Sequence, residues 1–261
     1  MVGDIGLGRY ITYLARSKND FSYSFSGFSR ILQQNDFNLG NLESPIIDNC
    51  PTGPLDTMVF CGDPKFIPYL SKNKFIFNLA NNHILNYGQS GFDQTQTFLK
   101  EENIPFFNSH YTGIEFLQKD FHGIKFGFLG FDLVSNSNFS QDKIINLIKK
   151  YNPQVDWLIV SIHWGSEYQP QAETWRVNLA HKMIDAGADI IHGHHPHVFQ
   201  NSEIYQDKLI YYSLGNFIFD QNWSKATSNS SLINLTVDKN KIIDTDSIPF
   251  TIKNNSHPEP I

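Results

Sequence analysis

Four of the six residues between positions 192 and 197 are histidines, in the run His192-Gly193-His194-His195-Pro196-His197. Imidazole nitrogens are common protein ligands for zinc, iron and manganese, so this run predicts a metal site. Pro196 stiffens the turn and lowers the entropy that is lost when the turn is ordered. His195 and His197 have His-x-His spacing and are the preferred ligands. His194 is an alternative ligand, whereas His192 is expected to belong to the preceding strand.

Two other polar segments follow apolar runs that are typical of buried strands. His163 comes directly after one such run and is a further candidate ligand. Asn82 and His83 follow another run. The amide oxygen of Asn82 can bind a hard cation, and His83 can protonate a leaving group. The alternative is that Asn81 and Asn82 only cap the turn that follows.

Asp4 and Glu43 supply candidate carboxylate ligands. A site with two metal ions needs an anionic bridge, because the cations lie only about 3.5–4 Å apart. Glu43 is the better candidate for this bridge, and Asp4 is expected to bind one ion. For each residue, a purely structural role is the alternative.

Three further residues are candidates for contacts with the substrate. Arg9 can bind an anionic group with two hydrogen bonds, or it can form a surface salt bridge. Glu167 can orient a ligand or substrate, or it can be a solvated loop carboxylate. Asn216 can contact the substrate, or Gly215-Asn216 can be only a tight turn.

Strands and helices alternate along the chain, which predicts an α/β fold. Residues 1–252 are expected to form one domain, followed by a poorly ordered tail over residues 253–261. Because strand ends on one edge of a sheet converge, we expect the polar residues named above to lie together. The sequence predicts strands at 37–42, 75–80, 124–131, 155–162, 188–191 and 209–212, helices at 28–34, 63–70, 91–102, 144–150 and 174–186, and a β-hairpin at 232–252.

The composition excludes several classes of protein. Hydrophobic residues make up 40% of the chain, and the formal charge is −6 with acids and bases interleaved, so nucleic-acid binding is not expected. The sequence contains no run of 18 apolar residues, so no membrane span is predicted. Cys50 and Cys61 are expected to be two buried thiols, with one bridge as the alternative. The strand before Asp4 would be unusually short, so we expect a longer natural N-terminus.

Taken together, these motifs resemble the CapA/PgsA family of poly-γ-glutamate capsule biosynthesis proteins, a branch of the calcineurin-like metallophosphatase superfamily. The resemblance covers about residues 2–220. It is carried, in the family's order, by Gly3-Asp4-Ile5-Gly6-Leu7-Gly8-Arg9, Asn41-Leu42-Glu43-Ser44-Pro45, Leu79-Ala80-Asn81-Asn82-His83, Tyr87-Gly88, Ser161-Ile162-His163-Trp164-Gly165-Ser166-Glu167-Tyr168, Ala186-Gly187-Ala188-Asp189, Gly193-His194-His195-Pro196-His197-Val198 and Tyr212-Ser213-Leu214-Gly215-Asn216-Phe217.

The resemblance implies a four-layer α/β/β/α sandwich with one or two divalent ions, manganese, iron or zinc. Asn82 and His83 match the family's ligand and general acid, and His163 matches its single histidine ligand. The stretch 194–197 matches the terminal Gly-His-x-His motif with one extra residue. Gly6 stands where the superfamily normally has a further histidine, so one ion loses a protein ligand.

The implied activity is a metal-dependent hydrolase that acts on an anionic substrate, either a phosphoester or a γ-linked glutamyl polymer. The alternative is a non-catalytic assembly component that keeps the fold and a metal. Members of the family are typically membrane-anchored and act outside the cytoplasm. Membrane-bound capsule synthesis subunits are therefore expected partners, provided that an N-terminal anchor precedes this sequence.

Overall fold

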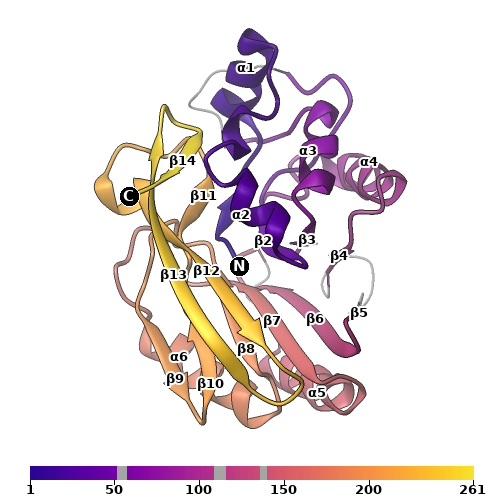
Figure 1. Ribbon diagram of the computed structural model, residues 1–261, viewed down its shortest axis with the longest axis vertical. Helices are drawn as coiled ribbons and strands as arrows, with labels where there is room; N and C mark the ends of the chain where they lie inside the picture. Colours follow the sequence, from indigo (N-terminus) through magenta and orange to yellow (C-terminus); the bar gives the residue numbers. More distant parts are fainter. Residues whose placement is uncertain (52–57, 109–115, 136–139) are drawn as a thin grey trace.

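The computed structural model describes residues 1–51, 58–108, 116–135 and 140–261 (Figure 1). Two large β-sheets form its centre. The first has the strand order β11-β1-β2-β3-β4, and all neighbouring strands in it are parallel. Its strands are β1 (Asp4–Ile5), β2 (Asn38–Leu42), β3 (Phe75–Asn78), β4 (Phe106–Phe107) and β11 (Asn216–Ile218).

The second sheet has the order β5-β6-β7-β8-β10-β9. Its inner strands are parallel, whereas β5 and β9 pair antiparallel at the two edges. Strands β7 and β8 are buried along their whole length, as expected for parallel strands that are covered on both faces. The strands are β5 (Leu117–Phe121), β6 (Ile124–Asp132), β7 (Trp157–His163), β8 (Ile190–His194), β9 (Ser202–Tyr205) and β10 (Lys208–Tyr211).

Helices cover the outer faces of both sheets. Figure 1 shows α1 to α4 beyond the first sheet, and α5 and α6 beyond the second. The helices are α1 (Arg9–Lys18), α2 (Ser29–Gln34), α3 (Ile67–Lys72), α4 (Gly88–Glu101), α5 (Gln141–Tyr151), α6 (Thr174–Asp185) and the short α7 (Lys225–Ser228). Among the described residues, no helix is both long enough and apolar enough to cross a membrane.

Three apolar clusters hold these four layers together. One packs the helices α1 to α4 against the first sheet, for example Phe92 with Phe77. A second lies between the two sheets, where the rings of Phe107 and Phe128 stack with centroids 5.6 Å apart. The third packs α5 and α6 against the second sheet. The predicted four-layer α/β/β/α sandwich is therefore confirmed.

A third sheet, β12-β13-β14, runs alongside both halves (Figure 1). Its long hairpin, β12 (Asn229–Val237) and β13 (Ile242–Lys253), is the hairpin that the sequence predicted at 232–252. The expectation of a poorly ordered tail over 253–261 is wrong. Strand β14 (His257–Pro260) pairs antiparallel with β13, and the His257 ring stacks on Tyr23 at 4.8 Å.

Two further features differ from the expectations. Helix α1 was not predicted, although it begins directly after the Gly3–Gly8 motif. Cys50 and Cys61 form a disulfide, not the two buried thiols that the sequence favoured. Their Cα atoms lie 5.8 Å apart, which is within the usual range for a bridge.

Candidate metal centre

The strand ends of both sheets meet at one site. In the first sheet Asp4 is in register with Asn216, and Glu43 comes directly after β2. In the second sheet His163 ends β7. The amide oxygen of Asn82 lies 2.9 Å from His163 Nε2, so the site spans both sheets. The convergence that the strand pattern predicted is therefore present.

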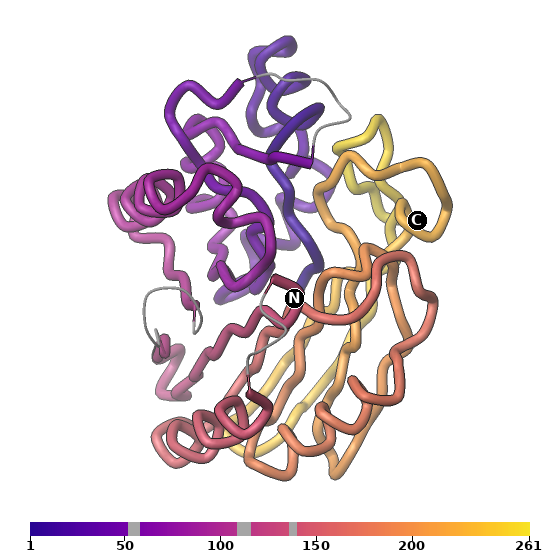
Figure 2. The backbone as a smooth tube through the Cα atoms, turned by 180° about the vertical axis from the view of Figure 1, so that it is seen from behind, coloured from indigo at the N-terminus to yellow at the C-terminus, as the bar shows by residue number. Residues whose placement is uncertain are grey.

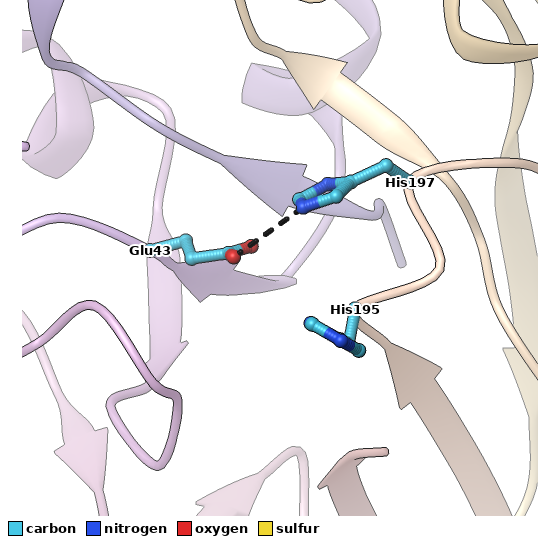
Figure 3. Close-up of side chains that lie close together, drawn as sticks. All are labelled: Glu43, His195 and His197. Carbon is cyan, nitrogen blue, oxygen red and sulfur yellow. Dashed lines mark ion pairs between the residues drawn. The ribbon is translucent and has the colours of Figure 1, made fainter. Parts of the chain in front are cut away.

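Two groups of three side chains can each hold a metal ion. Asp4, Glu43 and His163 form one group, and Glu43, His195 and His197 form the other. Within each group the ligand atoms all lie within 4.8 Å of one another. Glu43 belongs to both, which is the position that a bridging carboxylate needs. Figure 3 shows Glu43 facing His195 and His197, which lie on one loop after β8.

The atoms of this site fit a divalent cation. Glu43 Oε1 and His195 Nδ1 are buried, and neither has a hydrogen-bond partner in the described part of the chain. Buried polar atoms normally have hydrogen-bond partners. Two buried atoms without such a partner at one site are therefore what a site for a bound cation would show. Glu43 Oε1 lies 3.6 Å from His163 Nε2 and 3.7 Å from His197 Nε2. Such a mixture of imidazole and carboxylate donors suits zinc, manganese or iron.

Burial sets the charges at the site. It lowers the pKa of His195 to about 4 and that of His163 well below its usual range, and neutral imidazole is the form that binds metals. Burial, with the nearby charge of Asp4, raises the pKa of Glu43 well above its usual range. Burial also opposes the charge of Asp4, but hydrogen bonds with two histidines hold its pKa well below the usual range.

Asn41 is a site residue that was not predicted. Its Nδ2 donates to Asp4 Oδ1 at 2.9 Å and to Glu43 Oε2 at 3.3 Å, so it holds the two carboxylates side by side. Asn41 lies two residues before Glu43, and the period of two along a strand puts such positions on one face. That spacing is the signal that points to it in the sequence.

Asn216 lies behind His197. It is only 1% exposed, and its Oδ1 lies 2.9 Å from His197 Nδ1. Its Nδ2 donates to the Thr227 carbonyl oxygen at 3.1 Å. Asn216 is thus enclosed and fixes the ring of His197 from behind, and its contact with a substrate stays a prediction.

His194 belongs to neither ligand group. It is the last residue of β8, so its ring lies on the same side as that of His192. His194 Nδ1 lies 3.0 Å from Asp4 Oδ1, and its Nε2 lies 3.1 Å from His192 Nδ1. The chain then turns, with left-handed φ values of 94° at His195 and 57° at His197, and their rings reach Glu43.

His83 lies beside the ligand groups with one nitrogen engaged. Its Nδ1 lies 3.0 Å from Asn86 Oδ1, an oxygen that also accepts the backbone N–H of Phe60 at 2.7 Å. His83 Nδ1 therefore carries the hydrogen, and Nε2 is the atom that can exchange a proton. The Phe60 ring packs on His83 at 4.1 Å, and burial lowers the pKa of His83 to about 4.

Arg9 makes a bidentate contact with a carboxylate of the chain itself, as in the salt-bridge alternative, although this pair is buried and not on the surface. The guanidinium bonds both carboxylate oxygens of Asp220, with Nε 3.1 Å from each. The guanidinium also lies 4.5 Å from the centroid of the Phe60 ring, the same ring that packs on His83. The positive charge is thus already compensated by Asp220.

Two carboxylates complete the electrostatics. Glu167 is half-buried after β7, and its charge contributes to the raised pKa of Glu43. Asp132 is buried at the end of β6, in register with His163, and acts on Glu43 in the same direction. Asp132 was not predicted, although an acid directly after the apolar run 124–131 follows the same strand-end pattern as the other site residues.

Two exposed rings lie next to the ligand loop. Tyr168 and Trp223 are 42% and 60% exposed, and their rings meet edge to face at 5.9 Å. The Tyr168 ring lies 6.3 Å from that of His197, and its hydroxyl accepts from the Gln221 amide at 3.4 Å. We call Tyr168 and Trp223 the aromatic ledge.

Gly6 has no space for a larger side chain. A Cβ atom at this position would lie 2.7 Å from Phe219 Cε2. The Phe219 ring also packs against His197, with centroids 4.9 Å apart. Phe219 therefore fills the volume that a histidine at position 6 would need.

Comparison with known proteins supports the resemblance seen in the sequence. A family model described as bacterial capsule synthesis protein PGA_cap matches residues 1–221. The capsule biosynthesis protein CapA of Bacillus anthracis is 30% identical, over all of this chain and 68% of its own length. The PGA biosynthesis protein CapA of Bacillus subtilis (strain 168) is 32% identical, over 92% of this chain and 67% of its own.

Solved structures with low sequence identity share the fold. A phosphatase from Mycoplasma pneumoniae superimposes with a TM-score of 0.58 at 16% identity, covering 96% of this chain and 92% of its own. The NAD nucleotidase of Haemophilus influenzae gives 0.55 at 13% identity, covering 93% of this chain and 53% of its own. The sandwich is thus of the metallophosphatase type. With the matched family model and the two CapA relatives, these findings show that the chain belongs to the CapA-type (PGA_cap) family of bacterial capsule synthesis proteins.

Proposed function

We propose that this member of the capsule synthesis family is a metal-dependent hydrolase. The observation that carries the proposal is the pair of candidate ligand groups that share Glu43, with buried atoms of Glu43 and His195 that have no hydrogen-bond partner among the described residues. Bound divalent cations would activate water and polarise a phosphoryl or carbonyl oxygen. The name of the Bacillus subtilis relative, a PGA biosynthesis protein, supports poly-γ-glutamate as the substrate, and the phosphatase that shares the fold supports a phosphoester.

The residues of the chain have distinct roles in this proposal. Asp4, Asn82 and His163 would hold one ion, His195 and His197 would hold the other, and Glu43 would contribute to both sites. His83 exchanges a proton with the leaving group through Nε2, since Nδ1 is engaged by Asn86. Arg9 does not bind the substrate directly, because it is paired with Asp220. It supports the Phe60 ring, on which His83 packs.

The test is hydrolysis by the purified chain supplied with Mn²⁺, Zn²⁺ or Fe²⁺. The substrates are a generic phosphodiester, a phosphomonoester and poly-γ-glutamate. His83→Ala should lower kcat by about 10²–10⁴-fold while metal content is unchanged. His122→Ala is the matched control, because His122 lies on the surface and pairs with Asp36. No turnover by the wild type with any of these metals would refute the proposal.

The aromatic ledge favours one second function, a component that holds polymer without cleaving it. Exposed Tyr168 and Trp223 offer an apolar surface directly beside His197. Such a component would bind poly-γ-glutamate in a metal-dependent way and release no shortened product. Product size on a gel therefore separates the two functions.

A further inference from the structure

Two histidines outside the ligand groups connect β8 to β1. His192 Nε2 lies 2.8 Å from the carbonyl oxygen of Val2, and His192 Nδ1 lies 3.1 Å from His194 Nε2. His194 Nδ1 in turn lies 3.0 Å from Asp4 Oδ1. All four residues are buried. A continuous chain of hydrogen bonds therefore runs from the backbone of Val2 to the carboxylate of Asp4.

The groups at the two ends of this series of hydrogen bonds fix which atoms donate and which accept. A carbonyl oxygen only accepts, so His192 Nε2 carries the hydrogen, and burial lowers the pKa of His192 well below its usual range. His192 Nδ1 is therefore an acceptor for His194 Nε2, and also for the Ser161 hydroxyl at 3.1 Å. At the other end, His194 Nδ1 faces the Asp4 carboxylate. Both ring nitrogens of His194 are thus engaged, one by Asp4 and one by His192, and neither is left to bind an ion.

We propose that His192 and His194 are positioning residues that hold Asp4 in its metal-binding orientation, and that His194 is not itself a ligand. The proposal rests on the metal site of the proposed function and not on hydrolysis. Neither ligand group contains His194. Partners behind the ligands of a metal site orient them in this way in many proteins.

The surroundings of Asp4 explain why it needs such support. Strand β1 consists of Asp4 and Ile5 alone, so little regular backbone pairing fixes the carboxylate. His194 and Asn41 both engage Oδ1. Oδ2, which accepts the backbone N–H of His195 at 3.3 Å and lies 3.4 Å from His197 Nδ1, is the oxygen left to face an ion.

The two nitrogens of His194 can be tested separately. Asparagine places its amide nitrogen near the position of Nδ1, and glutamine places its own near that of Nε2. His194→Asn therefore keeps a donor toward Asp4, and His194→Gln keeps only the donor toward His192. The measurement is the number and affinity of bound Mn²⁺ and Zn²⁺ ions by calorimetric titration of the metal-free protein.

The hydrogen-bond chain from Val2 through His192 and His194 to Asp4, which we call the relay, predicts a specific order of metal affinities. His194→Gln should bind as many ions as the wild type with about 10–100-fold lower affinity, whereas His194→Asn should stay close to the wild type. If His194 were a ligand, both variants would lose an ion, as His195→Ala is expected to do. That result, or equal affinities for the two variants, would overturn the proposal.

His192 gives an independent test, because it touches no candidate ligand. His192→Asn keeps an acceptor for His194, and His192→Gln keeps only the donor toward Val2. The Gln variant should weaken metal binding, and its effect should not add to that of His194→Gln, since both break one chain. His181→Gln, at a histidine that pairs with Glu203, is the control and should change nothing. Additive effects would contradict the relay.

These measurements separate the inference from the proposed function. A wild type that binds metal but hydrolyses nothing removes the hydrolase proposal and leaves the relay standing. A wild type that binds no ion overturns both. Melting temperatures of the metal-free variants identify any loss of affinity that comes from misfolding.

Discussion

Replacing Glu43 with glutamine should stabilise the metal-free protein and abolish its stabilisation by metal. Glu43 Oε1 is buried and has no hydrogen-bond partner within the described ranges, and burial and the charge of Asp4 raise the pKa of Glu43 above the ordinary 4.5. Folding therefore requires either a buried charge or the uptake of a proton. Glutamine has nearly the same shape and needs neither.

The ordinary pKa of Glu43 sets an upper limit on this gain. Protonating a carboxyl group of pKa 4.5 at pH 7 costs about 3.4 kcal/mol, so the metal-free Glu43→Gln protein gains at most that amount. For a chain of this size, this corresponds to a rise in Tm of up to about 10 °C. Because the folded state holds the proton more tightly than the unfolded state, the gain should vanish below pH 4.5 and grow as the pH rises above it.

Thermal unfolding with a chelator, and then with excess Mn²⁺, measures both halves of the prediction. A metal at 100 times its Kd stabilises the wild type by about 2.7 kcal/mol, and this increment should be lost in the variant. Glu203→Gln is the matched control. Hydrogen bonds to Tyr212 and His181 lower the pKa of Glu203 despite partial burial, so this change should not stabilise. A Glu43→Gln protein that melts lower than the wild type in chelator, or keeps the full response to Mn²⁺, refutes the reasoning.

Three other predictions follow from single contacts. Asn216→Ala frees the ring of His197 and should weaken metal binding by about 10–100-fold without changing the number of ions, as titration calorimetry can show. Trp223→Ala removes the more exposed ring of the ledge and should weaken poly-γ-glutamate binding at unchanged metal affinity; equal binding in a co-sedimentation assay would exclude the ledge as a contact. Cys50→Ser with Cys61→Ser opens a short loop and should lower the free energy of unfolding by about 2–3 kcal/mol, which a urea titration measures and which reduced wild type should reproduce.

The convergence of the candidate ligands was predictable because it depends on strand ends. His163 and Glu43 each close an apolar run, and parallel strands bring such ends together whatever the loops do. The ambiguity within 194–197 was not resolvable in this way. It depends on the last residue of β8 and on the left-handed turns at His195 and His197, which no side-chain pattern encodes.

Contacts between residues that are far apart in the sequence could not be predicted either. Arg9 and Asp220 are 211 positions apart, so the chemistry of Arg9 as an anion binder was visible but its partner was not. The disulfide also depends on how close Cys50 and Cys61 lie in the fold, since the spacing of two cysteines is compatible with bridged and free thiols alike.

The position of β1 has a consequence for how the protein folds. The first strand of the chain is an inner strand of its sheet, between β2 and β11, and in Figures 1 and 2 the first residue lies near the middle of the molecule. Asp4 of β1 pairs with Asn216 of β11. One side of β1 is therefore an unpaired edge until more than two hundred further residues have been synthesised. Contacts of such long range close slowly. The metal centre should therefore be among the last parts to form, and a chain that stops before β11 should aggregate and should not acquire metal.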